Sequence, residues 1–227
     1  MTNQKTAILI FANSAERDGV LKPFRKSVSL FAELNHQTVE KVKRSGLPYF
    51  HFSEKEQTGA TFGERYTNAI QFVYDQGFDN IITIGNDTPH LQTSQLLETA
   101  NKLKANPIVL GPSLDGGFYL LGLNKAHFNA NTFLKLPWQT SSLTKSIERL
   151  LSVKKIEVLF LDVLSDIDSV SDIKKVIESF RSLGLKLLKI LLHIISSEKN
   201  LFRSIYLYYS SLLKETLFNK GSPVFTS

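Results

Sequence analysis

Short apolar runs recur along the chain and are separated by longer stretches in which apolar residues return at helical spacing. The runs at residues 7–11, 81–84 and 108–110 consist of Ile, Val, Leu, Ala, Phe and a single Thr. Strands that are covered by helices on both faces have this composition, because neither face meets water. The pattern predicts an α/β fold in three layers, with a mostly parallel sheet and helices on both faces.

Six strands are expected, with helices between most of them. They fall near residues 5–12, 47–53, 80–86, 107–111, 117–123 and 156–161. The fifth strand follows the fourth after only a short turn. A parallel connection needs a longer crossover, so the fifth strand is expected to be antiparallel.

Carboxylates follow three of these strands directly. Asp87 comes after the third strand, Asp115 lies in the turn after the fourth, and Asp166 and Asp168 come after the sixth. Polar ligands of open α/β sheets bind beyond the carboxyl ends of the strands. Asp and Gly are also ordinary turn formers, so each motif alone has a structural explanation. The three motifs together favour a site at this edge of the sheet.

Four segments together resemble a bacterial family of glycosyltransferase-A-like proteins of the selenodomain-associated transferase type, within the nucleotide-diphospho-sugar transferase superfamily. In chain order they are IGNDTPHL, LGPSLDGGFYLLGL, LPWQTSSL and DIDSVSDI. The pattern GPxxDGGFYLLG is the specific one, and the resemblance runs from about residue 5 to about residue 180. It implies a glycosyltransferase-A-like fold and a transferase that moves a glycosyl or nucleotidyl group from a nucleotide donor.

The resemblance also implies roles for the acidic motifs. Asp87 corresponds to the first ligand of a divalent metal and Asp168 to the second, with Asp166 as a substitute. Mg²⁺ or Mn²⁺ is the expected cofactor, because a diphosphate must be neutralised and these ions are held by one or two carboxylates together with phosphate oxygens. Asp115, with Gly116 and Gly117, corresponds to the catalytic part of the site that faces the sugar or the acceptor.

Nucleotide-binding residues are expected in two further segments. The loop at 13–24 stands where the family binds nucleotide phosphates, and Gly19 and Lys22 match it there. Asn13 occupies a position at which lysine is common in the family. Arg65 matches a family arginine and is expected in the first turn of a helix, where a ligand anion or a surface carboxylate such as Glu64 could pair with it.

The same loop supports an alternative function. Pro23 and Phe24 replace a Thr-Arg pair of the family, and Glu16 and Asp18 add negative charge. Phosphates need donors and positive charge. The alternative is therefore a catalytically silent relative that acts as a nucleotide-binding or scaffolding subunit.

Composition limits the remaining possibilities. The chain has 227 residues, of which 42% are hydrophobic, so it can bury one substantial core. It has no cysteine, which excludes disulfides and thiolate metal sites. The net charge is +6, but the lysines are scattered and form no nucleic-acid module, so nucleic acid is not an expected partner. The N-terminus begins with the first strand and lacks a leader pattern, which predicts a cytoplasmic location.

The chain divides into a transferase domain at 1–180 and a helical extension at 181–227. One helix is expected from about residue 170 to 182, with Ser169 or Ser171 as its cap, and further helices to about residue 218. The apolar run 183–195 is too short and too charged to span a bilayer. Packing on the core or on a second subunit is favoured, and contact with a membrane surface is the alternative.

Two single residues leave their roles open. Trp138 could stack on a base or sugar, or it could close the core. His90 is the only histidine near the expected site, and an exposed loop position is the expected one. The spacing of the histidines predicts no zinc site. The expected partners are a nucleotide or nucleotide sugar and a small acceptor.

Overall fold

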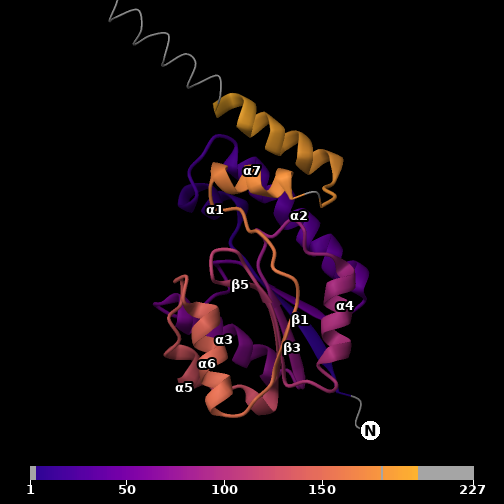
Figure 1. The fold of residues 1–227 in the computed structure, drawn as a ribbon, viewed down its shortest axis with the longest axis vertical. Helices are drawn as coiled ribbons and strands as arrows, with labels where there is room; N and C mark the ends of the chain where they lie inside the picture. Colours follow the sequence, from indigo (N-terminus) through magenta and orange to yellow (C-terminus); the bar gives the residue numbers. More distant parts are fainter. Residues whose placement is uncertain (1–3, 180, 199–227) are drawn as a thin grey trace, which may run out of the picture.

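The computed structural model describes residues 4–179 and 181–198. Within them, strands and helices alternate along most of the chain (Figure 1). The strands are β1 (Thr6–Phe11), β2 (Tyr49–Phe52), β3 (Asn80–Ile84), β4 (Ile108–Pro112), β5 (Phe118–Asn124) and β6 (Val158–Phe160). The helices are α1 (Ala15–Leu21), α2 (Ser27–Ser45), α3 (Phe62–Asp75), α4 (Thr93–Lys102), the 3-10 helix η1 (Lys125–His127), α5 (Ala130–Leu134), α6 (Leu143–Val153) and α7 (Val170–Glu178).

All six predicted strands join one sheet, in the order β2-β1-β3-β5-β4-β6. β1 is parallel to both of its neighbours, and β4 is parallel to β6. β5 is antiparallel to β3 and β4, which confirms the prediction from the short turn before it. Gly116 in that turn has a φ of 92°, a conformation that glycine adopts without the cost a Cβ would bring.

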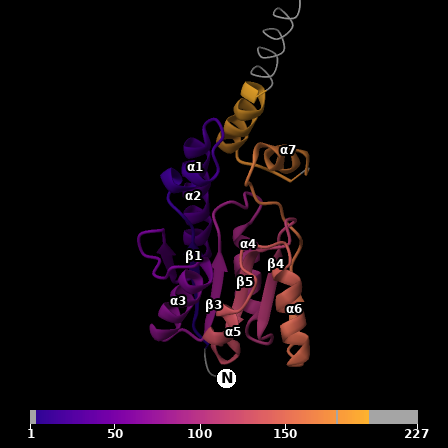
Figure 2. The ribbon, with the colours of Figure 1, turned by 90° about the vertical axis from the view of Figure 1, so that its left-hand side faces the viewer.

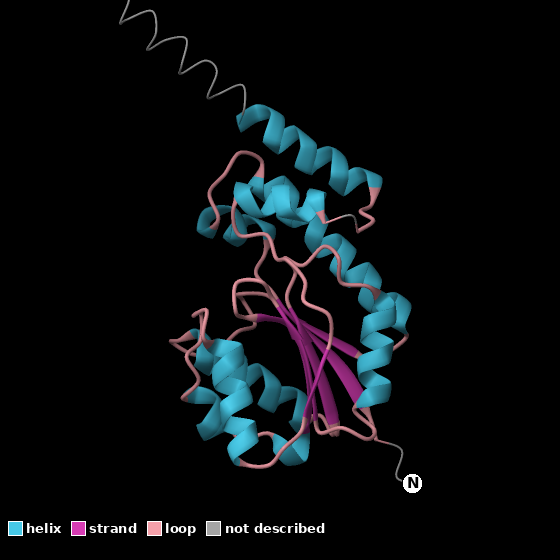
Figure 3. Ribbon diagram, in the orientation of Figure 1, coloured by secondary structure: helices cyan, strands magenta, loops and turns pink. Residues whose placement is uncertain are grey.

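Alternate residues of the strands supply two separate cores. Leu9 and Ile81 point to the face that is covered by α3, α5 and α6. Ile8 and Ile82 point to the opposite face, which is covered by α2 and α4. Figures 1 and 3 show these two groups of helices on the two sides of the sheet. The three-layer arrangement predicted from the apolar runs is confirmed.

A third core lies beyond the sheet and joins α1, α2, α7 and the helical residues 185–198. Its buried members are Ala15, Leu30, Phe31, Leu34, Ile167, Ile173, Val176, Leu187, Leu191 and Ile194. Figure 2 shows α7 and residues 185–198 at the end of the molecule that is far from the N-terminus. This part of the extension therefore packs on the rest of the chain through one face of its helix.

The helix predicted over 170–182 is shorter than expected. α7 begins at Val170, where Ser169, one of the two expected caps, forms a capping box with Asp172, but it ends at Glu178. The next helical stretch begins at residue 185, directly after Gly184, because glycine disfavours the helix interior. The helices expected beyond residue 198 lie outside the described residues. Within those residues, no helix is both long and apolar enough to cross a membrane.

Candidate functional site

A cleft of about 1050 Å³ opens where β1 and β3 end and β5 begins. Segments that are far apart in the sequence form its wall: they lie within 11–22, 54–66, 83–87, 115–119, 138–143 and 166–168. Parallel strands bring the loops at their carboxyl ends to one edge, which is where ligands of such sheets bind. The cleft is therefore at the edge that the acidic motifs indicated.

Seven of the eight predicted site residues line this cleft. They are Asn13, Lys22, Arg65, Asp87, Asp115, Gly117 and Asp168. Gly116 is not among the lining residues. A Cβ at Gly116 would collide with the Ser141 carbonyl, so this glycine allows the turn to pack against the loop before α6. Its part is to shape the turn that presents Asp115.

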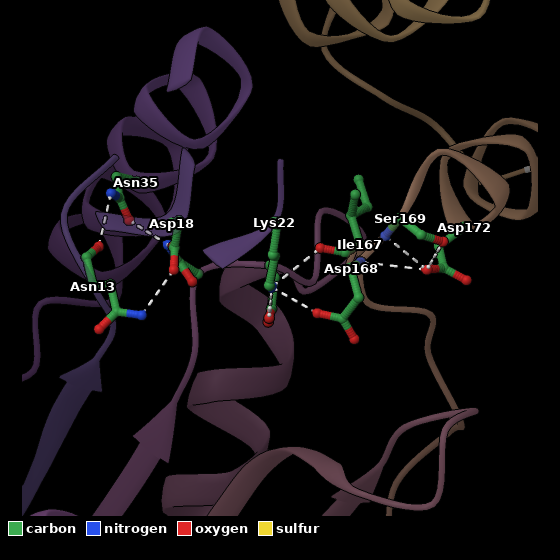
Figure 4. A network of polar contacts seen from close by, with 10 residues as sticks. Asn13, Asp18, Lys22, Asn35, Ile167, Asp168, Ser169 and Asp172 are labelled. Carbon is green, nitrogen blue, oxygen red and sulfur yellow. Dashed lines mark hydrogen bonds and ion pairs between the residues drawn. The ribbon is translucent and has the colours of Figure 1, made fainter. Parts of the chain in front are cut away.

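The Lys22 ammonium group joins two of the predicted metal ligands. Its Nζ lies 2.9 Å from Asp87 Oδ2 and 2.7 Å from Asp168 Oδ1, and it also donates to the Ile167 carbonyl at 3.2 Å. Figure 4 shows Lys22 reaching toward Ile167 and Asp168 from a separate segment. Burial works to lower the pKa of Lys22, but the charges of Asp87 and Asp168 outweigh it and hold the pKa above its ordinary value. Lys22 therefore stays charged, and the two carboxylates share its single positive charge.

Three carboxylates form a group beside this lysine. One oxygen each of Asp115, Asp166 and Asp168 lies within 4.8 Å of the other two. Burial, and then the charges of Asp87, Asp115 and Asp168, raise the pKa of Asp166 to about 7. Carboxylates at such distances repel one another unless a cation or a proton lies between them. Their oxygens are the donors that Mg²⁺ and Mn²⁺ prefer, so the group fits a divalent ion.

Asp87 does not belong to this group of three. Its carboxylate is held by Lys22, and its backbone carbonyl accepts from Ile167 N at 3.0 Å, which ties the end of β3 to the 166–168 segment. Asp168 is shared: it binds Lys22 and also completes the group with Asp115 and Asp166. The structure thus brings Asp166, expected only as a substitute, into the centre of the acidic part of the cleft.

The segment after β1, predicted as a loop, is mostly helical. α1 occupies Ala15–Leu21 because Ser14 caps it, with its side chain accepting from Arg17 N. Glu54 in turn holds Ser14 by accepting from its backbone N and its Oγ, both at 2.7 Å. The loop prediction was wrong for these residues, because it took the charged run after Ser14 as irregular instead of as the first turn of a helix.

Asp18 of α1 is a site residue that sequence reasoning missed. Its buried carboxylate accepts from Asn13 Nδ2 at 2.8 Å (Figure 4). It also accepts from Asn86 Nδ2 at 2.8 Å, and Asn86 donates to Asn35 Oδ1 as well. Asn13 donates only one of its two amide N–H groups to Asp18, so its second N–H and its oxygen are left for a ligand. Asn86 precedes Asp87 in one motif, which could have pointed to it, whereas Asp18 gave no local signal.

Arg65 supplies positive charge to the cleft. It lies in the first turn of α3, behind a capping box of Thr61 and Glu64. Glu64 accepts from the backbone N of Ala60 and Thr61, and Arg65 donates to the Ala60 carbonyl at 3.3 Å. Among the described residues, no carboxylate lies within ion-pair distance of Arg65 or of Arg17, which also lines the cleft. Their charges are available to an anionic ligand.

Aromatic side chains form the wall near β5. Trp138 lies 4.9 Å from the Tyr66 ring and 5.5 Å from the Phe62 ring, and its Nε1 donates to the Phe133 carbonyl at 2.7 Å. It packs so closely on Gly63 that a Cβ there would meet its indole ring. Trp138 therefore closes the core, and its ring also lines the cleft, where it can contact a base or a sugar.

The expectation that His90 is exposed was wrong. The residue is buried, and its Nε2 lies 3.4 Å from Ser179 Oγ of the segment after α7. Burial, and then the charges of Arg181 and Lys41, lower the pKa of His90 to about 4. His90 is therefore neutral near pH 7 and supports the loop after β3 from outside the cleft.

Comparisons with known proteins agree with this fold. Residues 28–140 match the family described as "Uncharacterized protein conserved in bacteria (DUF2064)". A comparison with curated proteins gives no match. A provisionally named nucleotide-diphospho-sugar transferase from Desulfovibrio desulfuricans superimposes with a TM-score of 0.71 and 22% identity, over 86% of this chain and 98% of that one. A 4-diphosphocytidyl-2C-methyl-D-erythritol synthase from Anaerococcus prevotii gives a TM-score of 0.51 at 12% identity, over 76% of this chain and 96% of that one. At these identities the two structures establish the fold, which is that of the nucleotide-diphospho-sugar transferases.

Proposed function

We propose that this chain, whose residues 28–140 match the bacterial family DUF2064, is a metal-dependent transferase that moves a glycosyl or nucleotidyl group from a nucleotide donor to a small acceptor. One observation carries the proposal. A cleft at the strand ends holds Lys22 and Asp87 beside the group formed by Asp115, Asp166 and Asp168. This arrangement offers oxygen ligands for a divalent ion, and Arg17 and Arg65 in the same cleft offer positive charge for phosphates.

Asn13, Lys22, Arg65 and Asp87 form the nucleotide side of the proposed site. Charge-assisted hydrogen bonds from Arg and Lys are the strongest means of holding a phosphate. The carboxylates that line the cleft nevertheless outnumber its cations, with Asp18, Glu54, Asp87, Asp115, Asp166 and Asp168 facing Arg17, Lys22 and Arg65. A polyanion would be repelled from this cleft unless a further cation accompanied it.

Mg²⁺ or Mn²⁺ is that cation in our proposal. Asp168 is the metal ligand that both the sequence resemblance and the geometry favour, and Asp166 and Asp115 lie beside it. Asp87 is paired with Lys22. When bound, the ion supplies positive charge to the phosphates of the donor. Asp115, which is exposed and fixed by a hydrogen bond from Gly117 N at 2.8 Å, faces the acceptor or the sugar.

One observation favours the alternative of a catalytically silent nucleotide-binding subunit. Asn86 donates its two side-chain N–H groups to Asp18 and Asn35, and Asn13 donates one of its two to Asp18, so only one amide N–H of this pair is left for a phosphate. A silent relative would show no turnover with any acceptor, whether it binds a nucleotide or acts as a scaffolding subunit. A cytoplasmic location stays a prediction from the sequence under either function.

A thermal-shift panel of nucleotides and nucleotide sugars, each with and without Mn²⁺, tests the proposal. At least one nucleotide is expected to raise the Tm only when Mn²⁺ is present, and Asp87→Asn and Asp168→Asn are expected to lose this rise. Asp162→Asn is the matched control, because Asp162 is an exposed acid after β6 that does not line the cleft. An equal rise in Tm in all three variants would contradict the assignment of Asp87 and Asp168 as metal ligands.

A further inference from the structure

Lys22 contacts the third core as well as the acids of the cleft. Its Nζ lies 4.9 Å from the ring centroid of Phe31, and it donates to the carbonyl of Ile167 at 3.2 Å. Phe31 and Ile167 are both completely buried in the third core. The position of the ammonium group therefore depends on two residues that this core holds in place.

Residues 185–198 complete that core. Leu187, Leu191 and Ile194 recur at helical spacing, are completely buried and pack with α2 and α7. Lys186 adds an ion pair of 2.6 Å with Glu33, a buried acid of α2. The described part of the extension is thus fixed to the same helix that carries Phe31.

We propose that the helical segment 185–198 maintains the geometry of the cleft, with Leu191 and Phe31 as positioning residues for Lys22. Leu191 keeps the third core closed, and the core keeps Phe31 and Ile167 against the lysine. Ile167 also lies between Asp166 and Asp168, so the same core fixes the backbone that carries both carboxylates. Loosening the helix releases the Lys22 ammonium group from Asp87 and Asp168.

The reactivity of Lys22 in the full-length protein tests this coupling directly. Lysines are labelled with a small amine acylating reagent, and the rate at each lysine is read by peptide mass spectrometry. Leu191→Ala leaves a cavity in the third core, and it should raise the labelling rate of Lys22 by at least about tenfold. Phe31→Leu keeps an apolar side chain but removes the ring, and it should raise the rate about two- to fivefold, as expected for loss of a cation–π contact.

Two control variants separate this effect from general loosening. Leu103→Ala opens a cavity in the core behind α4, and Leu192→Ala changes an exposed neighbour of Leu191 on the same helix. Neither should change the Lys22 rate. Lys41, whose Nζ donates to the Pro89 carbonyl at 2.8 Å, is an internal reference that should keep its rate in all variants.

The outcomes decide the proposal. An unchanged labelling rate of Lys22 in a folded Leu191→Ala protein would overturn it. An equal rise in the labelling rates of Lys22 and Lys41 would also overturn it. If Leu191→Ala does not fold, Phe31→Leu decides, because the labelling rate of Lys22 must rise in that variant. The labelling needs no nucleotide, so it stands apart from the proposed function. The consequence for ligands does rest on that function: Leu191→Ala should also weaken Mn²⁺-dependent nucleotide binding.

Discussion

Replacing Lys22 by methionine is the change with the most specific expected outcome. The substitution keeps a long apolar stem but removes the ammonium group between Asp87 and Asp168. A hydrogen bond to a charged group contributes about 1.5–3 kcal/mol to stability. The side chains of Asp87 and Asp168 are 27% and 52% exposed, so water replaces part of the lost contact. We expect the free energy of unfolding to fall by about 2 kcal/mol in total.

Urea denaturation without metal measures this loss. With a slope of about 2 kcal/mol per molar urea, the midpoint should fall by about 1 M, and the slope itself should not change. The control is Lys43→Met, which removes an exposed ion pair with Glu40 and should cost less than about 0.5 kcal/mol.

Mn²⁺ should stabilise the Lys22→Met protein more than the parent. Without the ammonium group, the acids beside Asp168 attract a divalent ion more strongly. A tenfold gain in affinity would add about 1.4 kcal/mol at saturating Mn²⁺. The reasoning would be refuted by a variant as stable as Lys43→Met, or by one that gains less from Mn²⁺ than the parent does.

Three further predictions follow from the site and the extension. Burial and the neighbouring acids raise the pKa of Asp166 to about 7. A cation needs the ionised form, so Mn²⁺ affinity measured by calorimetry should fall between pH 8 and pH 6, by up to about tenfold per unit below the pKa, and Asp166→Asn should flatten the profile. The same raised pKa makes ionised Asp166 unfavourable in the folded protein, so its contribution to metal-free stability should decline as the pH rises from about 4 to 7. Asp115→Asn should keep the Tm of the parent but lose turnover, once an acceptor is found; a large drop in Tm would instead make Asp115 a structural turn residue. Deletion of the residues after Arg181 should lower stability or solubility, because it removes Leu187, Leu191 and Ile194 from the third core. The intact chain should not co-sediment with anionic liposomes, and salt-sensitive co-sedimentation that a well-folded truncation lacks would favour a membrane-surface role.

The strands could be predicted because their signal is local. Runs such as 7–11 and 81–84 are almost entirely apolar at alternate and intervening positions alike, as expected of strands covered by helices on both sides. The direction of β5 was also predictable. A turn of a few residues reverses the chain, so the two strands that it joins are antiparallel. The acids at the strand ends followed from the same reasoning, because a sheet places its carboxyl ends at one edge.

The contacts inside the site could not be predicted in the same way. Lys22 pairs with residues 65 and 146 positions away, and no local pattern states which of several acids it will meet. His90 is buried, and its ring contacts Ser179, which the chain brings back from the end of α7. Asp18 looked like a surface charge of a loop, and only the fold places it against Asn13 and Asn86. Long-range packing decides each of these cases.

Calorimetric titration of a nucleotide from the thermal-shift panel tests the central claim most directly. The parent, Asp168→Asn and the control Asp162→Asn are each titrated in Mn²⁺ and again in a chelator. The account predicts binding by the parent and by Asp162→Asn in Mn²⁺ only, with affinity at least about tenfold weaker in Asp168→Asn. Equal binding by all three proteins, or binding by the parent that persists in the chelator, would contradict it.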